Sequence, residues 1–203
     1  MKGIYLEPEE SRAIIGSIWA VSKHPDRDCI LLDLLWQSGA RVSEALGLVP
    51  ERVGLTSVGL DNLKQRKGKE DPIPVKEVEV TQALCNRIKS FCNANNIKKG
   101  DWIFQSNRGT NQLSRWYVWW IVNKASEYVR VYKLGKRNRG RPPRFKGAWP
   151  HLFRHSNAMY LLEFTGDISL VQQQLGHRSI KTTQEYAYTK RPKIRKAISE
   201  MDW

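Results

Sequence analysis

The segment from His151 to Tyr186 contains many side chains that can handle protons or bind phosphate. It reads HLFRHSNAMYLLEFTGDISLVQQQLGHRSIKTTQEY, and it includes His155, His177 and Arg154 as well as those two residues. Imidazoles transfer protons near neutral pH and ligate metals, while arginine binds phosphate through paired hydrogen bonds. Three interpretations compete: a zinc site, a packed helical core with incidental polar groups, or an active site that cuts a phosphodiester.

The zinc interpretation rests on His151 and His155, which are spaced i,i+4 and so share one face of a helix. However, the residue after His151 is Leu152, not the glutamate that a zinc hydrolase uses as its base. A third ligand would have to come from His177 or from an isolated cysteine. We therefore predict no metal site, and we assign His155 a structural role beside Arg154.

Phosphoryl transfer without a metal needs cationic side chains, because the charge on the phosphoryl oxygens has to be neutralised. Carboxylate clusters of the kind that hold two magnesium ions are not evident in the sequence. Arginine is always charged and can bond two phosphate oxygens at once. Tyrosine has a free pKa of about 10, and a strongly cationic pocket would favour its nucleophilic phenolate. Tyr186 is the candidate nucleophile, with Tyr188 as its rival.

The chain is strongly basic. Its 203 residues include 34 lysines and arginines against 20 acids, a net charge of +14, which points to a polyanionic partner. Half of that net charge lies in KLGKRNRGRPPRFK, at Lys133, Lys136, Arg137, Arg139, Arg141, Arg144 and Lys146. Glycines and prolines oppose helix and strand there, so we predict a basic loop that grips phosphates without recognising sequence. A solvated loop without a partner is the alternative.

Length and composition fit one globular domain with a real core, since 40% of the residues are hydrophobic. The best apolar run, CILLDLLW, is interrupted by Asp33 and is too short for a membrane span. The N-terminal MKGIYLEPEESR lacks the apolar stretch of a secretory signal. Cys29, Cys85 and Cys92 are odd in number and lack paired spacing, which predicts buried free thiols and a reducing cytoplasm.

Helical periodicity dominates the sequence and must position these groups. One helix is predicted to begin at Pro8, and a second to run from Pro25 to Gly39, which stops it. A short helix is predicted within 40–50, ending near Gly47. Two more are predicted, one that begins after the capping residue Thr81 and one across 112–132. In the last of these, Leu113, Trp116 and Trp120 share one side. We therefore assign its aromatic residues to the core and not to a surface that stacks on bases.

Between these helices, the spacing of the apolar residues changes from the helical period to the alternation typical of strands. Residues 57–80 predict two or three short strands around a polar turn at 65–70. The predicted fold class is mainly α with a small antiparallel β-sheet. Near the C-terminus, the apolar spacing of Ile194, Ala197, Ile198 and Met201 predicts an amphipathic helix, which docks on its own domain or on a neighbouring protomer.

Four motifs, taken in order, resemble those of the tyrosine recombinases, also called the phage integrase family. HLFRH is followed by LGHRS and TTQEY, and QSGARVSEALGL lies roughly 110 residues upstream. Each motif alone is weak, but their order and spacing are specific, and the resemblance covers about residues 5–190. It implies a catalytic domain over 1–190 and a tail over 191–203. The catalytic pattern begins within ten residues of Met1, as in small recombinases that invert fimbrial promoter segments and lack an N-terminal helical domain.

Matched position by position, the resemblance implies roles for five residues. Arg41 in GARVSE and Arg154 in HLFRH would clamp the scissile phosphate of DNA. His151 would hydrogen-bond that phosphate and assist proton transfer, and His177 in LGHRS would hold a nonbridging oxygen. Tyr186 in TTQEY would be the nucleophile.

The resemblance also implies a lysine on a sheet hairpin as the acid for the leaving 5′-hydroxyl. QRKGKEDPIP matches that hairpin, about one residue shorter than the common pattern. We choose Lys67, with Lys64 and Lys69 as close competitors. Separately, Glu44 is interpreted as a carboxylate that braces a basic neighbour.

The implied activity is site-specific recombination, in which DNA strands are cleaved and rejoined through a 3′-phosphotyrosyl link. The resemblance implies that the reaction needs no cofactor, neither a metal ion nor ATP. Implied partners are double-stranded DNA, other copies of the chain in a homotetramer on paired sites, and accessory DNA-bending proteins, in a prokaryotic cytoplasm and without a membrane. Integration of a mobile element, excision, inversion and dimer resolution all fit. A relaxing enzyme like type IB topoisomerases and a non-catalytic DNA-binding regulator are the alternatives.

Overall fold

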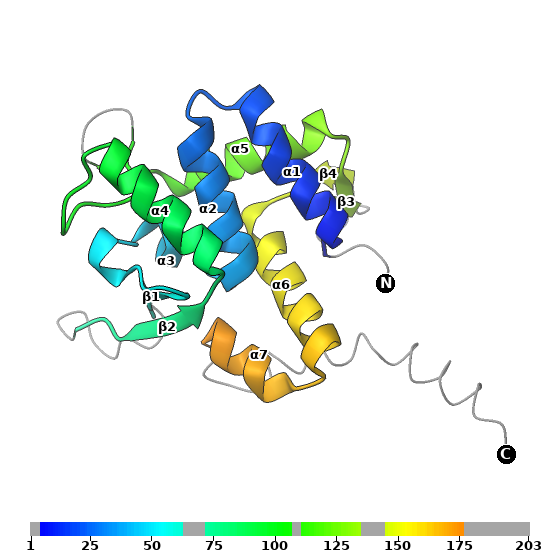
Figure 1. Cartoon of the computed structure of the whole chain (residues 1–203). Coiled ribbons are helices and arrows are strands. Elements are labelled where there is room, and N and C mark those ends of the chain that lie inside the picture. Colours follow the sequence, from blue (N-terminus) through cyan, green and yellow to red (C-terminus); the bar gives the residue numbers. More distant parts are fainter. Residues whose placement is uncertain (1–4, 63–71, 107–110, 135–144, 177–203) are drawn as a thin grey trace, which may run out of the picture.

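Helices make up most of the structure (Figure 1). The computed structural model describes residues 5–62, 72–106, 111–134 and 145–176. Its α-helices are α1 (Pro8–Val21), α2 (Pro25–Ser38), α3 (Val42–Leu46), α4 (Gln82–Ala94), α5 (Arg115–Tyr128), α6 (Pro150–Thr165) and α7 (Ile168–Leu175). A short 3₁₀ turn, η1 (Pro50–Arg52), follows α3.

Two antiparallel ladders complete the described part of the fold. β1 (Ser57–Asp61) pairs with β2 (Val75–Glu79), with Leu60 opposite Lys76. This ladder confirms the predicted strands and, with the helices, the predicted fold class. β3 (Tyr132–Leu134) pairs with β4 (Phe145–Gly147).

The second ladder corrects the prediction of a loop across 133–146, which is wrong at both ends. Lys133 and Lys146 lie opposite each other in β3 and β4. The glycines and prolines that suggested a loop all fall between the two strands, at 135–143, so they do not oppose pairing on either side.

Several helix ends follow the signals expected from the sequence. α1 and α2 begin with Pro8 and Pro25 in their first turns, where the missing N–H costs no hydrogen bond. α2 ends at Gly39, whose φ of 60° is the left-handed conformation that glycine adopts without strain. The Thr81 hydroxyl accepts a hydrogen bond from the Leu84 N–H and caps α4.

Helix α5 corrects two predictions. It begins at Arg115 and ends at Tyr128, because Arg130 adopts a φ of 57° and turns the chain toward β3. Leu113 precedes the helix, so the spacing counted from it does not follow one helical face. Trp120 packs against the core as predicted, but Trp116 is 67% exposed, and its assignment to the core is wrong.

The main core lies between α1, α2, α4, α5 and α6 and one face of the β1–β2 ladder. Helix α2 is central to it and packs against α1, α4 and α6 (Figure 1). A smaller apolar cluster, formed by Ala158, Leu162, Val171 and Leu175, fixes α7 on α6. This packing brings the C-terminal end of α7 close to β2 (Figure 1).

The three cysteines are buried free thiols, as predicted. In the described ranges, no helix is long and apolar enough to cross a membrane.

Candidate active site

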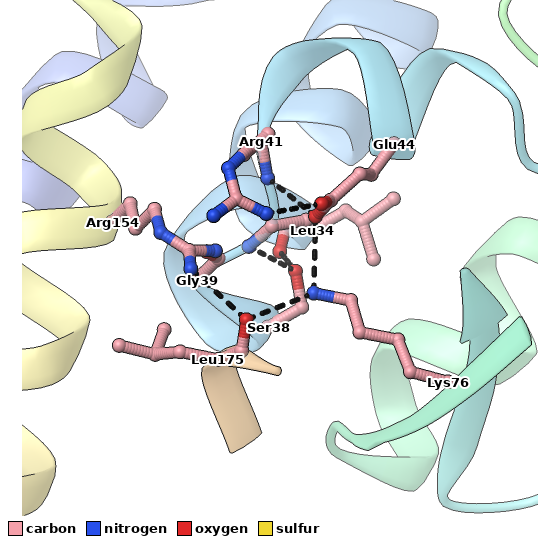
Figure 2. A network of polar contacts seen from close by, with 9 residues as sticks. Leu34, Ser38, Gly39, Arg41, Glu44, Lys76, Arg154 and Leu175 are labelled. Atoms are coloured by element: carbon pink, nitrogen blue, oxygen red, sulfur yellow. Dashed lines mark hydrogen bonds and ion pairs between the residues drawn. The ribbon is translucent and has the colours of Figure 1, made fainter. Parts of the chain in front are cut away.

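A sharp turn between α2 and α3 positions Arg41 (Figure 2). Gly39 makes this turn possible, because a Cβ there would lie 2.5 Å from Leu175 Cδ2 and 2.6 Å from Asn157 Oδ1. Arg41 is the N-cap residue of α3, and the Glu44 carboxylate accepts two hydrogen bonds from it: from the Arg41 backbone N–H to Oε2 at 3.0 Å, and from Nη1 to Oε1 at 2.6 Å. The buried Glu44 therefore braces a basic neighbour, as the sequence predicted.

Lys76 is the second cation on Glu44, and it is not among the site residues predicted from the sequence. Its Nζ lies 3.0 Å from Glu44 Oε2 and donates to the carbonyl oxygen of Leu175 at 3.1 Å. A signal was available, because strand alternation places Lys76 on the same face of β2 as the buried Val78. A lysine facing inward on a strand usually has a specific partner.

Arg154, in the second turn of α6, is the largest buried polar side chain of the cluster, with 2% of it exposed. Its Nη1 donates to the Gly39 carbonyl at 2.6 Å and its Nη2 to the Leu175 carbonyl at 2.9 Å. Both acceptors lie at the C-terminal ends of helices, where unpaired carbonyls carry partial negative charge. The guanidinium thus joins the ends of α2 and α7 (Figure 2).

Arg41 and Lys76 pair with one carboxylate, that of Glu44, and Arg154 shares the Leu175 carbonyl with Lys76, so the three cations form one cluster (Figure 2). Burial acts to raise the pKa of Glu44, but attraction to Lys76 and hydrogen bonds from Arg41 outweigh it and hold that pKa below its usual value. Burial also lowers the pKa of Lys76, although its pairing with Glu44 opposes the effect. With Glu44 ionised, the cluster keeps a positive charge that favours an anionic ligand.

His151 lies beside this cluster at the start of α6. It is exposed, and together with Arg41 it lines a cleft of about 530 Å³. The His151 and His155 rings meet edge to face, with centroids 4.6 Å apart, so the predicted shared helical face is confirmed. Within the described ranges, no group of three or more histidine, cysteine, aspartate or glutamate side chains could hold a metal ion.

The structure thus brings together Arg41, His151 and Arg154 of the predicted site residues. Lys67, His177 and Tyr186 lie outside the described residues, as do the competitors Lys64, Lys69 and Tyr188. Helix α7 ends at Leu175, whose carbonyl belongs to the cluster, and His177 follows two residues later in the chain.

The predicted phosphate-binding cations are mostly outside the described residues as well. These are Lys136, Arg137, Arg139, Arg141 and Arg144, and for Lys146 the structure describes the backbone alone. Lys133 is described, and 9% of it is exposed. Its Nζ lies 2.6 Å from Glu10 Oε2, so its assignment as a loop cation available to DNA is wrong.

Distant elements of a mainly helical domain thus bring two arginines and a lysine together, an arrangement whose charge and hydrogen-bond donors suit an anionic group such as phosphate. The chain belongs to the phage integrase family, because the model of that family matches residues 5–191. The resemblance drawn from the four motifs is therefore confirmed.

Two curated relatives illustrate this membership. The tyrosine recombinase XerD of Mycobacterium leprae (strain TN) is 32% identical over 193 residues, which cover 89% of this chain and 55% of the relative. XerD of Halalkalibacterium halodurans is 30% identical over 188 residues, covering 92% of this chain and 58% of the relative. The chain spans just over half the length of both.

Solved structures share the fold. The post-cleavage complex of the XerH site-specific recombinase with its palindromic difH substrate has a TM-score of 0.73 at 23% identity, covering 97% of this chain and 52% of that one. The catalytic domain of bacteriophage HP1 integrase has a TM-score of 0.59 at 17% identity, covering 97% and 94%. At such identities the likeness establishes the fold alone.

Proposed function

We propose that this chain is the catalytic domain of a site-specific recombinase that cleaves and rejoins DNA through a phosphotyrosyl intermediate. The observation that carries the proposal is that Arg41 lies close to Arg154 and His151, which are more than 100 residues further along the chain, at one cationic cluster. Membership of the phage integrase family supports it. The XerD relatives are tyrosine recombinases by name, and XerH, a site-specific recombinase, has been solved bound to its palindromic difH substrate.

In the proposed reaction, Tyr186 is the nucleophile. Its phenolic oxygen attacks the scissile phosphorus and passes its proton to the imidazole of His151, while the bond to the 5′ oxygen breaks. The departing 5′ oxygen takes a proton from the hairpin lysine, which we assign to Lys67, and leaves as a hydroxyl. The product is a 3′-phosphotyrosyl link, and attack by the 5′-hydroxyl of a partner strand reverses the step.

Arg41 and Arg154 would neutralise the phosphate during this exchange. Guanidinium groups are suited to this task because they stay charged and can bond two nonbridging oxygens. His151, exposed on the same cleft as Arg41, would donate a hydrogen bond to the phosphate, and His177 would hold a further oxygen. The energy of the broken ester is kept in the phosphotyrosyl bond, so the exchange requires neither ATP nor a metal ion.

The proposed partner is double-stranded DNA, bound by a tetramer that forms on paired sites. The basic residues of 136–146 would hold phosphates outside the active site. Residues 1–190 would form the catalytic domain, and residues 191–203 would dock on the same or on a neighbouring protomer. Two successive strand exchanges would then form and resolve a four-way junction.

A covalent trap tests the proposal. The protein is incubated with a library of DNA duplexes that contain a randomised segment. Each duplex carries a nick beside that segment, so that the short strand piece released by cleavage diffuses away. We expect a denaturant-resistant protein–DNA adduct in the presence of EDTA. DNA binding without any adduct would identify a non-catalytic regulator and contradict the proposal.

Plasmids that carry the selected site then separate recombination from relaxation. We expect exchange between paired sites. Relaxation of plain supercoiled plasmid, without exchange between paired sites, would instead indicate an enzyme of the type IB topoisomerase kind.

A further inference from the structure

Asn157 lies on the side of α6 that meets α2, and the proposed reaction does not use it. The residue is buried, with 7% of it exposed. Its Nδ2 donates two hydrogen bonds, to the carbonyl oxygens of Trp36 and Gln37, both at 2.9 Å. These carbonyls belong to the last turn of α2, so a side chain of one helix caps the C-terminal end of another.

The capped end of α2 leads directly into the turn that carries Arg41. Arg41 follows Gln37 by four positions, and it is the N-cap residue of α3. One turn before Asn157 on α6, Arg154 donates to the carbonyl of Gly39 within the same turn (Figure 2). Two side chains spaced i,i+3 on α6 thus hold successive parts of the backbone that precedes Arg41.

The other helices that end in a left-handed glycine are closed differently. Gly166 and Gly176, at the ends of α6 and α7, donate their own backbone N–H groups to carbonyls of the preceding turn. Those ends are therefore closed by local backbone contacts. The end of α2 is instead held by hydrogen bonds from α6, so its position depends on how Asn157 is placed.

The amide oxygen of Asn157 argues against a role in stability alone. Both N–H groups of the amide are used, but Oδ1 is buried and has no hydrogen-bond partner in the described part of the chain. A buried acceptor without a partner destabilises a fold, and an apolar side chain of similar size would avoid this cost. Such costs are typically retained at functional sites, where they fix a geometry.

We propose that Asn157 is a positioning residue for strand cleavage, which acts through Arg41. By fixing the end of α2 against α6, it holds the Arg41 guanidinium close to that of Arg154, where the scissile phosphate would bind. The inference rests on the proposed function, because that function assigns Arg41 to the phosphate. Asn157 itself is buried and acts without contacting DNA.

Two substitutions remove the donors without a large change in volume. Asn157→Leu replaces the amide with an apolar group, and Asn157→Asp keeps the shape but offers only acceptors to the two carbonyls. We expect either change to slow single-turnover adduct formation about tenfold or more, with DNA affinity changed less than about twofold. Asn95→Leu is the matched control, because Asn95 Nδ2 caps the end of α4 through the Phe91 carbonyl at 2.9 Å.

A double-mutant cycle separates positioning from a general loss of structure. In an Arg41→Lys background, adding Asn157→Leu should slow the residual cleavage by less than about twofold, because the guanidinium that Asn157 positions is gone. A purely structural role would give the same loss in both backgrounds. If Asn157→Leu does not fold, Asn157→Ser replaces it in the cycle, since serine keeps one donor and should give a smaller loss.

The side-chain Nε–H resonance of Arg41 reports its position without DNA, and its loss in Arg41→Lys identifies it. It should shift in Asn157→Leu and Asn157→Asp and stay in place in Asn95→Leu. The inference is overturned if the Asn157 variants cleave at the wild-type rate, if the losses are equal in both backgrounds, or if the resonance does not move. If wild-type protein forms no adduct, the proposed function fails, and the resonance alone still decides whether Asn157 positions Arg41.

Discussion

Arg154 and Glu44 are both buried and charged, and each has at least one partner that is distant in sequence. Arg154 donates to the carbonyls of Gly39 and Leu175, and Glu44 accepts from Arg41 and Lys76. Motif spacing was sufficient to select Arg41 and Arg154. It could not select Lys76, because the carboxylate and the carbonyl that hold this lysine belong to α3 and α7, not to its own strand.

Replacing Glu44 tests whether its carboxylate holds the cluster together. We expect Glu44→Gln to lower the free energy of unfolding by about 3–5 kcal/mol, since the change leaves buried cations uncompensated. Strand cleavage should also slow, because Arg41 loses its brace. Urea unfolding and single-turnover adduct formation measure the two effects.

The pH dependence of stability is a second measure of the same carboxylate. The pKa of Glu44 in the fold lies below its usual value of 4.5, so its stabilising effect is complete above that value and is lost as the pH falls through the folded pKa. Glu44→Gln should lose less stability over this acid range than wild type. Glu9→Gln is the control, because Glu9 pairs with Arg12 with both side chains exposed, and little change is expected. Equal stability in wild type and Glu44→Gln at every pH would contradict the assigned role.

At the scale of elements, the site lies where the end of α2, the start of α3, strand β2 and the end of α7 meet (Figure 2). Lys76 and Gln174 attach α7 to β2, since the Gln174 Nε2 donates to the Glu79 carbonyl at 2.8 Å. Gly176 allows Lys76 to pass beneath it, because a Cβ there would lie 2.8 Å from Lys76 Cδ.

Two glycines that end helices provide a matched pair. Gly166 and Gly176 have φ values of 70° and 63°, but a Cβ at Gly166 would meet open space. Gly166→Ala should cost about 1 kcal/mol of stability from backbone strain alone and leave cleavage unchanged. Gly176→Ala should cost more and slow cleavage, since Lys76 would have to leave Glu44 or Leu175. Equal losses of stability, with equal cleavage rates, would show that Lys76 does not couple α7 to the site.

Elements with local chemical signals were predictable from the sequence. The prolines that begin α1 and α2, the glycine that ends α2 and the threonine that caps α4 all act within a few residues of their own positions. The β3–β4 ladder was not predictable, because each strand has three residues and pairing depends on a partner beyond 135–144. Trp116 was wrongly assigned to the core, because the exposure of its side chain depends on where α5 begins and on which elements pack against that helix.

Across the whole molecule, not every basic side chain that contributes to the net charge of +14 is free to bind a partner. Lys133 is used internally, since its ion pair with Glu10 joins β3 to the first turn of α1. A count of basic residues therefore overestimates the number of phosphates that this segment can bind.

Salt dependence should separate internal from DNA-binding cations. Replacing Arg137, Arg139, Arg141 and Arg144 with alanine should reduce the salt slope of DNA affinity by roughly 0.9 for each phosphate that the variant no longer binds. Lys133→Met should leave the slope unchanged and lower stability instead. An unchanged slope in the fourfold variant would mean that these arginines do not contact DNA.

In the proposed reaction the phenol of Tyr186 attacks DNA at a phosphate that the two guanidinium groups bind. Mass spectrometry of the proteolysed covalent adduct measures this most directly, with Tyr186→Phe and Tyr188→Phe as paired variants. We predict a nucleotide attached to the peptide that contains Tyr186, complete loss of adduct in Tyr186→Phe, and normal adduct in Tyr188→Phe. A nucleotide on any other residue, or an adduct that survives in Tyr186→Phe, would contradict the account.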